Sequence, residues 1–293
     1  MLRAAHLLPL TRLAAGLPQS ARDRLAATSA RRALKRNSKR VERAREHISR
    51  CFPEWDSSQQ QHCLAAHFDH RYRLLFDLSW LRHAPLTRIT DSIASWHGFE
   101  QLESALRSRR PVIMATPHHG DWERFNLVMG TRVAAAVLYK PSTDPAIEQW
   151  LVTLRSRSGV IPLPANRRGI RQVLEHLRNG GIVGILPDQI PRSGSGVVAP
   201  FFDQPAATMT LIHQLVQKTR SLVFFGSCIR QAQGFKVSID PAPDELYAGD
   251  AAASASAMNR AIENIVRRTP EQYLWTYRRW STPADNPLPV KPP

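Results

Sequence analysis

The sequence has few cysteines and no long apolar run. Its three cysteines, Cys51, Cys63 and Cys228, are odd in number and lack a C-x-x-C spacing, which argues against a disulfide framework and against a cysteine zinc site. We therefore expect a reducing compartment. No segment approaches the roughly 18 consecutive apolar residues of a membrane-spanning helix, and the N-terminal stretch lacks a convincing secretory signal.

Acidic residues are scarce relative to basic ones. The chain has 40 Lys and Arg against 24 Asp and Glu, a formal net charge of +16 at pH 7, which favours an anionic partner such as nucleic acid, an acidic protein or anionic lipid. Residues 1–36 are rich in arginine and leucine. They are compatible with a basic amphipathic helix that associates with a membrane surface, and equally with a solvated surface helix. The leucines concerned are Leu2, Leu7, Leu8, Leu10 and Leu13.

The character of the chain changes near residue 110. Residues 20–109 have a helical pattern without an intervening strand, whereas short β-rich runs alternate with amphipathic segments from 111 onward. This alternation predicts an α/β fold with a largely parallel sheet. The expected strands are PVIMAT, VAAAVLY, GVIPLP, GIVGIL, SLVFFGSCI and FKVSI, and the expected helical segments are WERFNLVMG, PAIEQWLVTLRSRS, RRGIRQVLEHLRNG, AATMTLIHQLVQKT and ASAMNRAIENIVRRTP.

We divide the chain accordingly. Residues 1–36 form the basic segment, residues 37–280 form one domain, and residues 281–293 form a proline-rich tail. Within the domain, a helical lead over 37–109 precedes the α/β part over 110–280. A domain boundary near 110 and a lead that packs directly on the sheet are both compatible with the pattern.

The densest polar cluster is TPHHGDWE, residues 116–123, directly after the first expected strand. Ligands of open α/β sheets bind at the carboxyl ends of strands. If a helix begins near Gly120, the Glu123 carboxylate can fix one imidazole nitrogen of His118, as in a base that activates an external hydroxyl. Gly120 would allow a close backbone approach, and the helix N-terminus would supply amide donors to an oxyanion.

Two alternatives apply to this cluster. His118 and Glu123 are also compatible with a surface capping pair. Neighbouring histidines with Asp121 and Glu123 offer metal ligands, but neither an H-E-x-x-H motif nor a matching distal cluster is present. His119 points away from His118 in an extended segment, so we choose His118.

Five segments in order resemble the bacterial lipid A biosynthesis (late) acyltransferases, the lauroyl and myristoyl transferase type within the lysophospholipid acyltransferase-like superfamily. The segments are NSKRVERAREHISRCFPEW, HHGDWE, LYKPSTDPAIEQWLVTLRSRSGVIPL, NGGIVGILPDQIPRSGSGVVAPFFDQPAATMT and PEQYLWTYRRW. They cover about residues 37–280. The chain departs from the family pattern in Asp121, where the family has Asn, in FFDQP for Phe-Phe-Gly, and in the missing or reduced N-terminal spanning helix.

The resemblance implies a mixed, mostly parallel sheet flanked by helices, with a helical N-terminal lead. It implies transfer of an acyl chain from an acyl-carrier-protein thioester to a hydroxyl of a lipid A precursor. His118 would be the general base and Glu123 its orienting partner, with no cofactor, no metal and no covalent acyl-enzyme. The partners would be acyl carrier protein, an anionic lipid acceptor and a membrane surface. The implied location is the cytoplasmic face of the bacterial inner membrane, with peripheral or N-terminal attachment.

Four further residues are candidates for substrate binding. Arg155, favoured over its neighbour Arg157, suits phosphate groups of the donor or acceptor. Asp188 ends an expected strand and either contacts substrate or caps a turn. Phe201 and Phe202 resemble the family's wall of the acyl site, although adjacent aromatics are also typical of a core.

The C-terminal segment QYLWTYRRW mixes aromatics and arginines. We expect Trp275 inside the domain and Arg278 and Arg279 near a membrane or the acidic carrier protein. The mixture is also compatible with stacking on single-stranded nucleic acid, but no nucleic-acid-binding module is recognisable, so we expect no such partner.

The alternative function from outside the enzyme class is a non-catalytic basic protein that docks on anionic surfaces. Within the enzyme class, the alternative acceptors are a lysophospholipid, an aminolipid or another glycolipid.

Overall fold

The computed structural model describes residues 15–192, 194–247 and 249–280 of the 293-residue chain. The five leucines of the N-terminal segment and the proline-rich tail over 281–293 lie outside these residues. No helix within the described ranges is long and apolar enough to span a bilayer.

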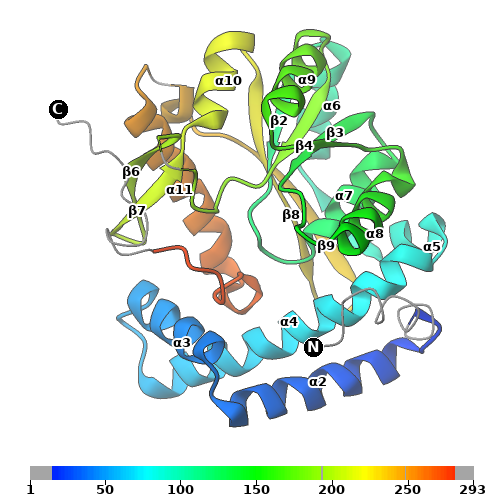
Figure 1. Ribbon diagram of the computed structural model, residues 1–293, viewed down its shortest axis with the longest axis vertical. Helices are drawn as coiled ribbons and strands as arrows, with labels where there is room; N and C mark the ends of the chain where they lie inside the picture. Colours follow the sequence, from blue (N-terminus) through cyan, green and yellow to red (C-terminus); the bar gives the residue numbers. More distant parts are fainter. Residues whose placement is uncertain (1–14, 193, 248, 281–293) are drawn as a thin grey trace.

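Three long helices form a layer beneath the rest of the molecule (Figure 1). They are α2 (Gln19–Arg36), α3 (Lys39–Cys51) and α4 (Ser57–His83). Helix α2 packs on α4 through the small buried residues Ala26 and Ala30, which allow the two helices to approach closely. Part of the basic segment 1–36 is therefore packed against the helical lead.

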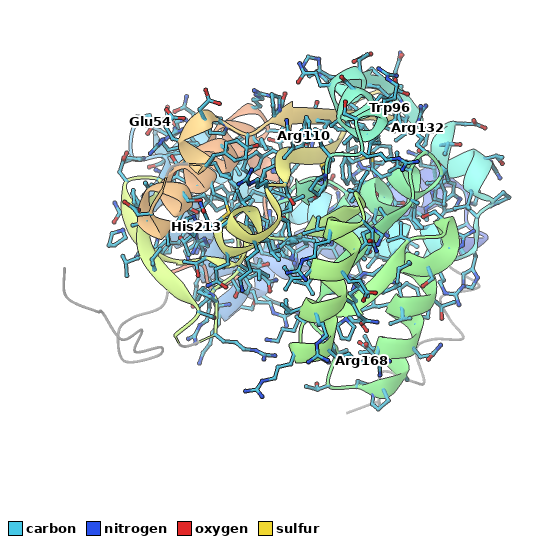
Figure 2. The ribbon with its side chains drawn as sticks, turned by 90° about the horizontal axis from the view of Figure 1, so that it is seen from above. Glu54, Trp96, Arg110, Arg132, Arg168 and His213 are labelled. Atoms are coloured by element: carbon cyan, nitrogen blue, oxygen red, sulfur yellow. The ribbon has the colours of Figure 1, made fainter. Side chains whose placement is uncertain are left out.

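One strand interrupts the region that we predicted to be helical. After the short α5 (Leu86–Thr90), β1 (Ile93–His97) lies at the edge of the sheet, and α6 (Phe99–Arg107) follows. Within the described ranges, strand β1 pairs only with β9. Its segment IASWH lacks an apolar run because it is an edge strand without a fully buried residue. The guanidinium of Arg132 lies 4.2 Å from the Trp96 ring and covers this edge (Figure 2).

The main sheet has seven strands in the order β1-β9-β8-β2-β5-β3-β4. Only the pair β8 and β9 is antiparallel, so the predicted fold class, α/β with a mostly parallel sheet and a helical lead, is confirmed. Besides β1, the strands are β2 (Val112–Ala115), β3 (Ala135–Tyr139), β4 (Ile161–Pro164), β5 (Ile182–Ile185), β8 (Leu222–Arg230) and β9 (Phe235–Pro241). Each of these six coincides with a predicted run.

Helices cover both faces of this sheet (Figure 1). Helix α7 packs on the face that includes Met114 and Ile182, whereas buried residues of α9 and α11 belong to the core on the face of Ile113 and Val183. The helices of the α/β part are α7 (Trp122–Gly130), α8 (Pro145–Arg155), α9 (Arg167–Arg178), α10 (Leu211–Thr219) and α11 (Ala251–Arg268), with short turns η2 (Ser156–Ser158), η3 (Asp244–Tyr247) and η4 (Pro270–Gln272).

A separate hairpin replaces part of one predicted helix. Strands β6 (Gly196–Phe201) and β7 (Gln204–Met209) pair antiparallel outside the main sheet. The predicted helical segment over 206–219 is therefore a helix only from Leu211. The turn of this hairpin places Phe202 and Asp203 at positive φ.

Candidate active site

His118 lies in the loop between β2 and α7, and a carboxylate from the end of β5 holds its ring. The Nδ1 atom is 2.7 Å from Oδ1 of Asp188, and the backbone N–H of His118 donates to Oδ2 of the same residue at 2.9 Å. The parallel pairing of β2 with β5 brings these two strand ends together. One carboxylate thus fixes both the backbone and the ring of His118.

This arrangement corrects the predicted identity of the orienting carboxylate. Nδ1 of His118 contacts Asp188, and Nε2 lies 3.1 Å from the amide nitrogen of Gln189. The Glu123 carboxylate instead accepts hydrogen bonds from Arg155, at 3.1 Å from Nε to each of its oxygens. Glu123 is in the first turn of α7 and faces across to α8, so it belongs to a neighbouring ion pair.

Asp188 remains ionised although it is almost completely buried, with 3% of its surface exposed. Burial by itself would raise the pKa of its carboxyl, but the charge of His118 and the two hydrogen bonds from that residue outweigh burial and hold the pKa below its ordinary value. The positive charge of Arg279 acts in the same direction. An ionised Asp188 accepts a hydrogen bond from Nδ1–H of His118, which leaves the lone pair of the imidazole on Nε2.

Arg155 and Arg157 have different surroundings. Arg155 lines the cavity described below. Burial by itself would lower the pKa of its guanidinium, but the charge of Glu123 and the hydrogen bonds to that residue, with smaller contributions from Tyr139 and Glu148, together outweigh burial and raise it. Arg157 donates to the carbonyls of Leu81 and Ala84 at the end of α4. It therefore satisfies helix-terminal acceptors rather than a ligand.

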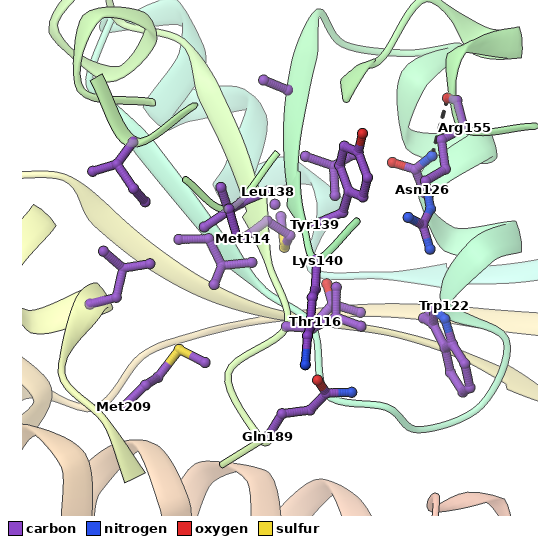
Figure 3. A pocket seen from close by; sticks show the side chains of 18 of the residues that line it. Met114, Thr116, Trp122, Asn126, Leu138, Tyr139, Lys140, Arg155, Gln189 and Met209 are labelled. Carbon is purple, nitrogen blue, oxygen red and sulfur yellow. Dashed lines mark hydrogen bonds between the residues drawn. The ribbon is translucent and has the colours of Figure 1, made fainter. Parts of the chain in front are cut away.

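A cavity of about 880 Å³ opens beside His118, within the range of roughly 300–1,000 Å³ typical of small-ligand sites. Trp122, Asn126 and Arg155 lie on one side of Thr116 and Lys140, and Met209 lies on the other (Figure 3). Its inner part, which we call the inner slot, is lined by apolar side chains of one sheet face, of helix α7 and of two loops. The inner slot comprises Met114, Phe125, Met129, Val133, Val137, Val160 and Ile182.

The outer part of the cavity carries positive charge. Four exposed cations line it, and we call them the basic rim: Lys140, Arg167, Arg171 and Arg192. Arg168, next to the rim at the start of α9, projects outward from the molecule (Figure 2). The cavity therefore joins an apolar interior to a cationic mouth, with His118 on its wall.

Two predicted aromatic contacts are wrong. Phe201 and Phe202 have 0% and 3% of their surface exposed, and neither lines the cavity. Phe202 packs against Phe52, at 5.4 Å between ring centroids, and Phe201 packs against Trp280 at 5.6 Å. Both rings fill the core between the β6–β7 hairpin and the helical lead.

Gly120 allows the turn to pack closely against β8, and this contact, rather than the approach of a ligand, accounts for the glycine. Its φ is +63°, and a Cβ built there would lie 2.2 Å from the carbonyl oxygen of Cys228. Its N–H donates to the carbonyl of Gln272, so this N–H is not free for an oxyanion.

Asp121, which replaces the family's Asn, caps α7 and accepts a hydrogen bond from Nε of Arg124 at 3.0 Å. The Asp121 side chain therefore contacts a buried arginine and does not line the cavity.

His119 points away from the cavity, as expected for the residue after His118. It is fully buried, and its Nε2 is 2.8 Å from the hydroxyl of Thr269. Burial lowers its pKa to about 3. Among the described residues no group of His, Cys, Asp and Glu is arranged to hold a metal ion.

The C-terminal segment 270–280 packs next to the site. Trp275 is completely buried, as predicted, but Arg279 is also buried, with 2% exposed, so its predicted place near a membrane or carrier protein is wrong. Its guanidinium donates to the Ala207 carbonyl at 2.6 Å and to the Thr208 hydroxyl at 3.1 Å. Arg278 is exposed. The segment thus fastens the hairpin to the domain and places a positive charge near Asp188.

Two residues of the site were not identified from the sequence. Gln189 contacts Nε2 of His118, and Tyr277 lines the cavity and accepts a hydrogen bond from the backbone N–H of Ile190 at 3.0 Å. Gln189 directly follows Asp188 at a strand end, and this position was a usable signal. Tyr277 had none, because its proximity arises only from the return of the chain after α11.

Comparison with known proteins identifies similar sequences. The family model described as bacterial lipid A biosynthesis acyltransferase matches residues 7–282. The chain is 29% identical to the lipid A biosynthesis palmitoleoyltransferase of Escherichia coli (strain K12), over 82% of this chain and 78% of that protein. It is 25% identical to the lipid A biosynthesis lauroyltransferase of the same organism, over 86% and 81%. A lipid A biosynthesis acyltransferase of Haemophilus influenzae is 24% identical, over 83% and 76%.

Proposed function

Because the chain belongs to the bacterial lipid A biosynthesis acyltransferases, we propose that it moves a fatty acyl group from an acyl-carrier-protein thioester to a hydroxyl of a lipid A precursor. The observation that carries the proposal is the His118 ring, held by Asp188 through Nδ1 on the wall of a cavity with an apolar interior. An apolar interior suits an acyl chain, and a fixed neutral imidazole suits proton abstraction from an alcohol.

The reaction follows from the tautomer of His118. With Nδ1–H donated to Asp188, Nε2 accepts the proton of the acceptor hydroxyl while the hydroxyl oxygen bonds to the thioester carbon. The amide of Gln189, 3.1 Å from Nε2, yields its place to that hydroxyl. The tetrahedral intermediate then breaks its C–S bond, and the imidazolium returns the proton to the departing thiolate. No acyl-enzyme forms in this sequence.

Arg155 and the start of α7 supply positive potential to the intermediate. The Glu123 carboxylate fixes Arg155 through Nε, and the positive end of the α7 dipole faces the same region because Trp122 and Glu123 in its first turn line the cavity. Glu123 acts in this proposal by holding Arg155 in place.

In this proposal the basic rim binds the head group of the lipid acceptor. Exposed Lys140, Arg167, Arg171 and Arg192 suit an anionic lipid whose head lies at the mouth and whose hydroxyl reaches His118. The same positive surface favours the acidic carrier protein and an anionic membrane. We accordingly place the protein at the cytoplasmic face of the inner membrane.

The test is product formation from defined substrates. Purified protein is incubated with acyl carrier proteins charged with several acyl chains and with a lipid A precursor, and products are identified by mass spectrometry. His118→Ala should lower turnover by about 10²- to 10⁴-fold, as expected for a lost general base. The matched control is His62→Ala, because His62 is exposed on α4 and does not line the cavity. Transfer by His118→Ala at the rate of the control would overturn the proposed mechanism.

A further inference from the structure

Gly184 in the middle of β5 has no backbone reason to be glycine. Its φ lies outside the left-handed region, and a Cβ built there would meet only ordinary contacts, the nearest being Cγ2 of Val137 at 3.4 Å. Glycine within a strand is normally destabilising relative to alanine. Gly226 on β8 differs, since a Cβ there would lie 2.3 Å from the Phe125 ring. The absence of a side chain at 184 therefore needs another explanation.

The register of the sheet places Gly184 on the floor of the inner slot. Gly184 pairs with Met114 of β2 on one side and with Val137 of β3 on the other, and all three line the cavity. Because side chains alternate between the faces of a strand, the missing Cβ would project on the same face as the side chains of Met114 and Val137. Phe125 and Met129 of α7 line the slot from the other side.

We infer that Gly184 sets the length of acyl chain that the inner slot accepts. This rests on the proposed function, in which the acyl carbonyl lies at His118 and its chain enters the slot. A methyl group at position 184 would occupy space that the chain otherwise fills. The fold would keep it without strain, because the neighbouring atoms are at van der Waals distance. Long chains would therefore lose contact area or be excluded, while shorter chains would still fit.

The expected effect is a shift of chain preference rather than a loss of transfer. One methylene in an apolar pocket changes discrimination by about 10-fold or more. In Gly184→Ala, kcat/KM for the longest acyl chain that the wild type uses should fall at least about 10-fold relative to a chain two carbons shorter. Gly184→Val should shift the preference further. The matched control is Gly249→Ala, because Gly249 has open space around its Cβ position and does not line the cavity.

The experiment compares the four proteins with acyl carrier proteins that carry saturated chains of increasing length. Thermal unfolding is measured in parallel, and Gly184→Ala should melt at or above the wild-type temperature. Binding of free fatty acids of the same lengths, followed by calorimetry, gives a second readout that needs no turnover. It should show the same shortening in both Gly184 variants.

The outcomes separate the two proposals. If the wild type transfers acyl chains and Gly184→Ala retains the wild-type length profile in transfer and in binding, the inference is overturned while the proposed function stands. If the wild type transfers no acyl chain and binds no fatty acid, the proposed function fails and the inference with it. A profile that shortens in Gly184→Ala and stays unchanged in Gly249→Ala supports both.

Discussion

The imidazole Nδ1 of His118 and the carboxylate of Asp188 are 2.7 Å apart, although the two residues are 70 positions apart in the chain. The contact exists because β2 and β5 are parallel neighbours that end at the same edge of the sheet. A carboxylate so placed sets the tautomer of the ring and stabilises the charge that the ring acquires. It makes Asp188, rather than Glu123, the positioning residue for His118.

Asp188→Asn should lower kcat by about 10²- to 10⁴-fold with little change in KM, because an amide neither fixes the tautomer nor stabilises the imidazolium. Steady-state kinetics with acyl carrier protein as donor measure both constants, and circular dichroism checks the fold. Asp203→Asn is the matched control, since Asp203 lies in the β6–β7 turn away from the cavity. Full activity of Asp188→Asn would show that His118 needs no carboxylate on Nδ1.

Replacing either Glu123 or Arg155 should lower the stability of the protein more than replacing one partner of an ordinary surface ion pair does. Their side chains are 8% and 16% exposed, and loss of one partner of a buried pair leaves an uncompensated charge at a cost of about 3–5 kcal/mol. Glu123→Gln and Arg155→Met should each lower the free energy of unfolding in urea, and the double variant should recover part of the loss.

Activity separates a structural ion pair from a functional one. The double variant of Glu123 and Arg155 regains stability in this expectation, yet its kcat stays low because the guanidinium of Arg155, which donates to the intermediate in the proposed function, is gone. A double variant that regains both stability and kcat would leave this ion pair without a role in transfer.

Stability should fall steeply as the pH drops below about 6.5, the ordinary pKa of histidine. Burial lowers the pKa of His67 and His119 to about 3 and of His47 and His70 to about 4. Between about 6.5 and these values the unfolded chain binds protons that the folded chain does not, so folding loses up to about 1.4 kcal/mol per pH unit for each such histidine. Below the folded pKa values the loss levels off.

Thermal melting at a series of pH values measures this dependence. His67→Gln should flatten the decline between pH 6 and pH 4, whereas His62→Gln, at an exposed position, should leave it unchanged. A melting temperature that is constant over this range would contradict the neutral state of the buried histidines.

The strands with continuous apolar runs could be predicted from the sequence, whereas segments whose secondary structure depends on tertiary contacts could not. β2, β5 and β8 are buried on both faces and their runs were recognised, whereas β1 is an edge strand with mixed polarity. The segment of β7 before α10 is alanine-rich and compatible with a helix. It forms a strand because its partner β6 and the buried Arg279 hold it in a hairpin.

The dependence on tertiary contacts also explains which residues of the site could be predicted. His118 was identified from its place after a strand, and Asp188 and Arg155 were recognised as candidates. Local spacing favoured Glu123 as the partner of His118, because it is five residues away. The actual partner depends on strand order, which one sequence does not show. Phe201 and Phe202 were misplaced for a related reason, since the hairpin turns both rings into the core.

The helix α2 should be an integral part of the folded domain and not a detachable segment. Its Arg22 donates to Asp77 of α4 at 3.2 Å, and both side chains are less than 10% exposed. Asp77 also pairs with Arg124 at 3.6 Å and with Arg230, and Arg22 lies 5.3 Å from the Trp80 ring. Removal of Arg22 therefore disturbs a charge cluster that reaches Arg124 of α7, the helix that follows the loop of His118.

Arg22→Met should destabilise the protein by about 1.5–3 kcal/mol, because it removes a buried hydrogen bond between charged groups, while Asp77 keeps its pairs with Arg124 and Arg230. Arg31→Met is the matched control on the same helix, since Arg31 is exposed and donates to the hydroxyl of Thr28 on that helix. Its effect should stay within about 0.5 kcal/mol. Urea unfolding monitored by tryptophan fluorescence measures both. Equal stability of the two variants would mean that the buried contact between Arg22 and Asp77 stabilises the domain no more than an exposed arginine of the same helix does.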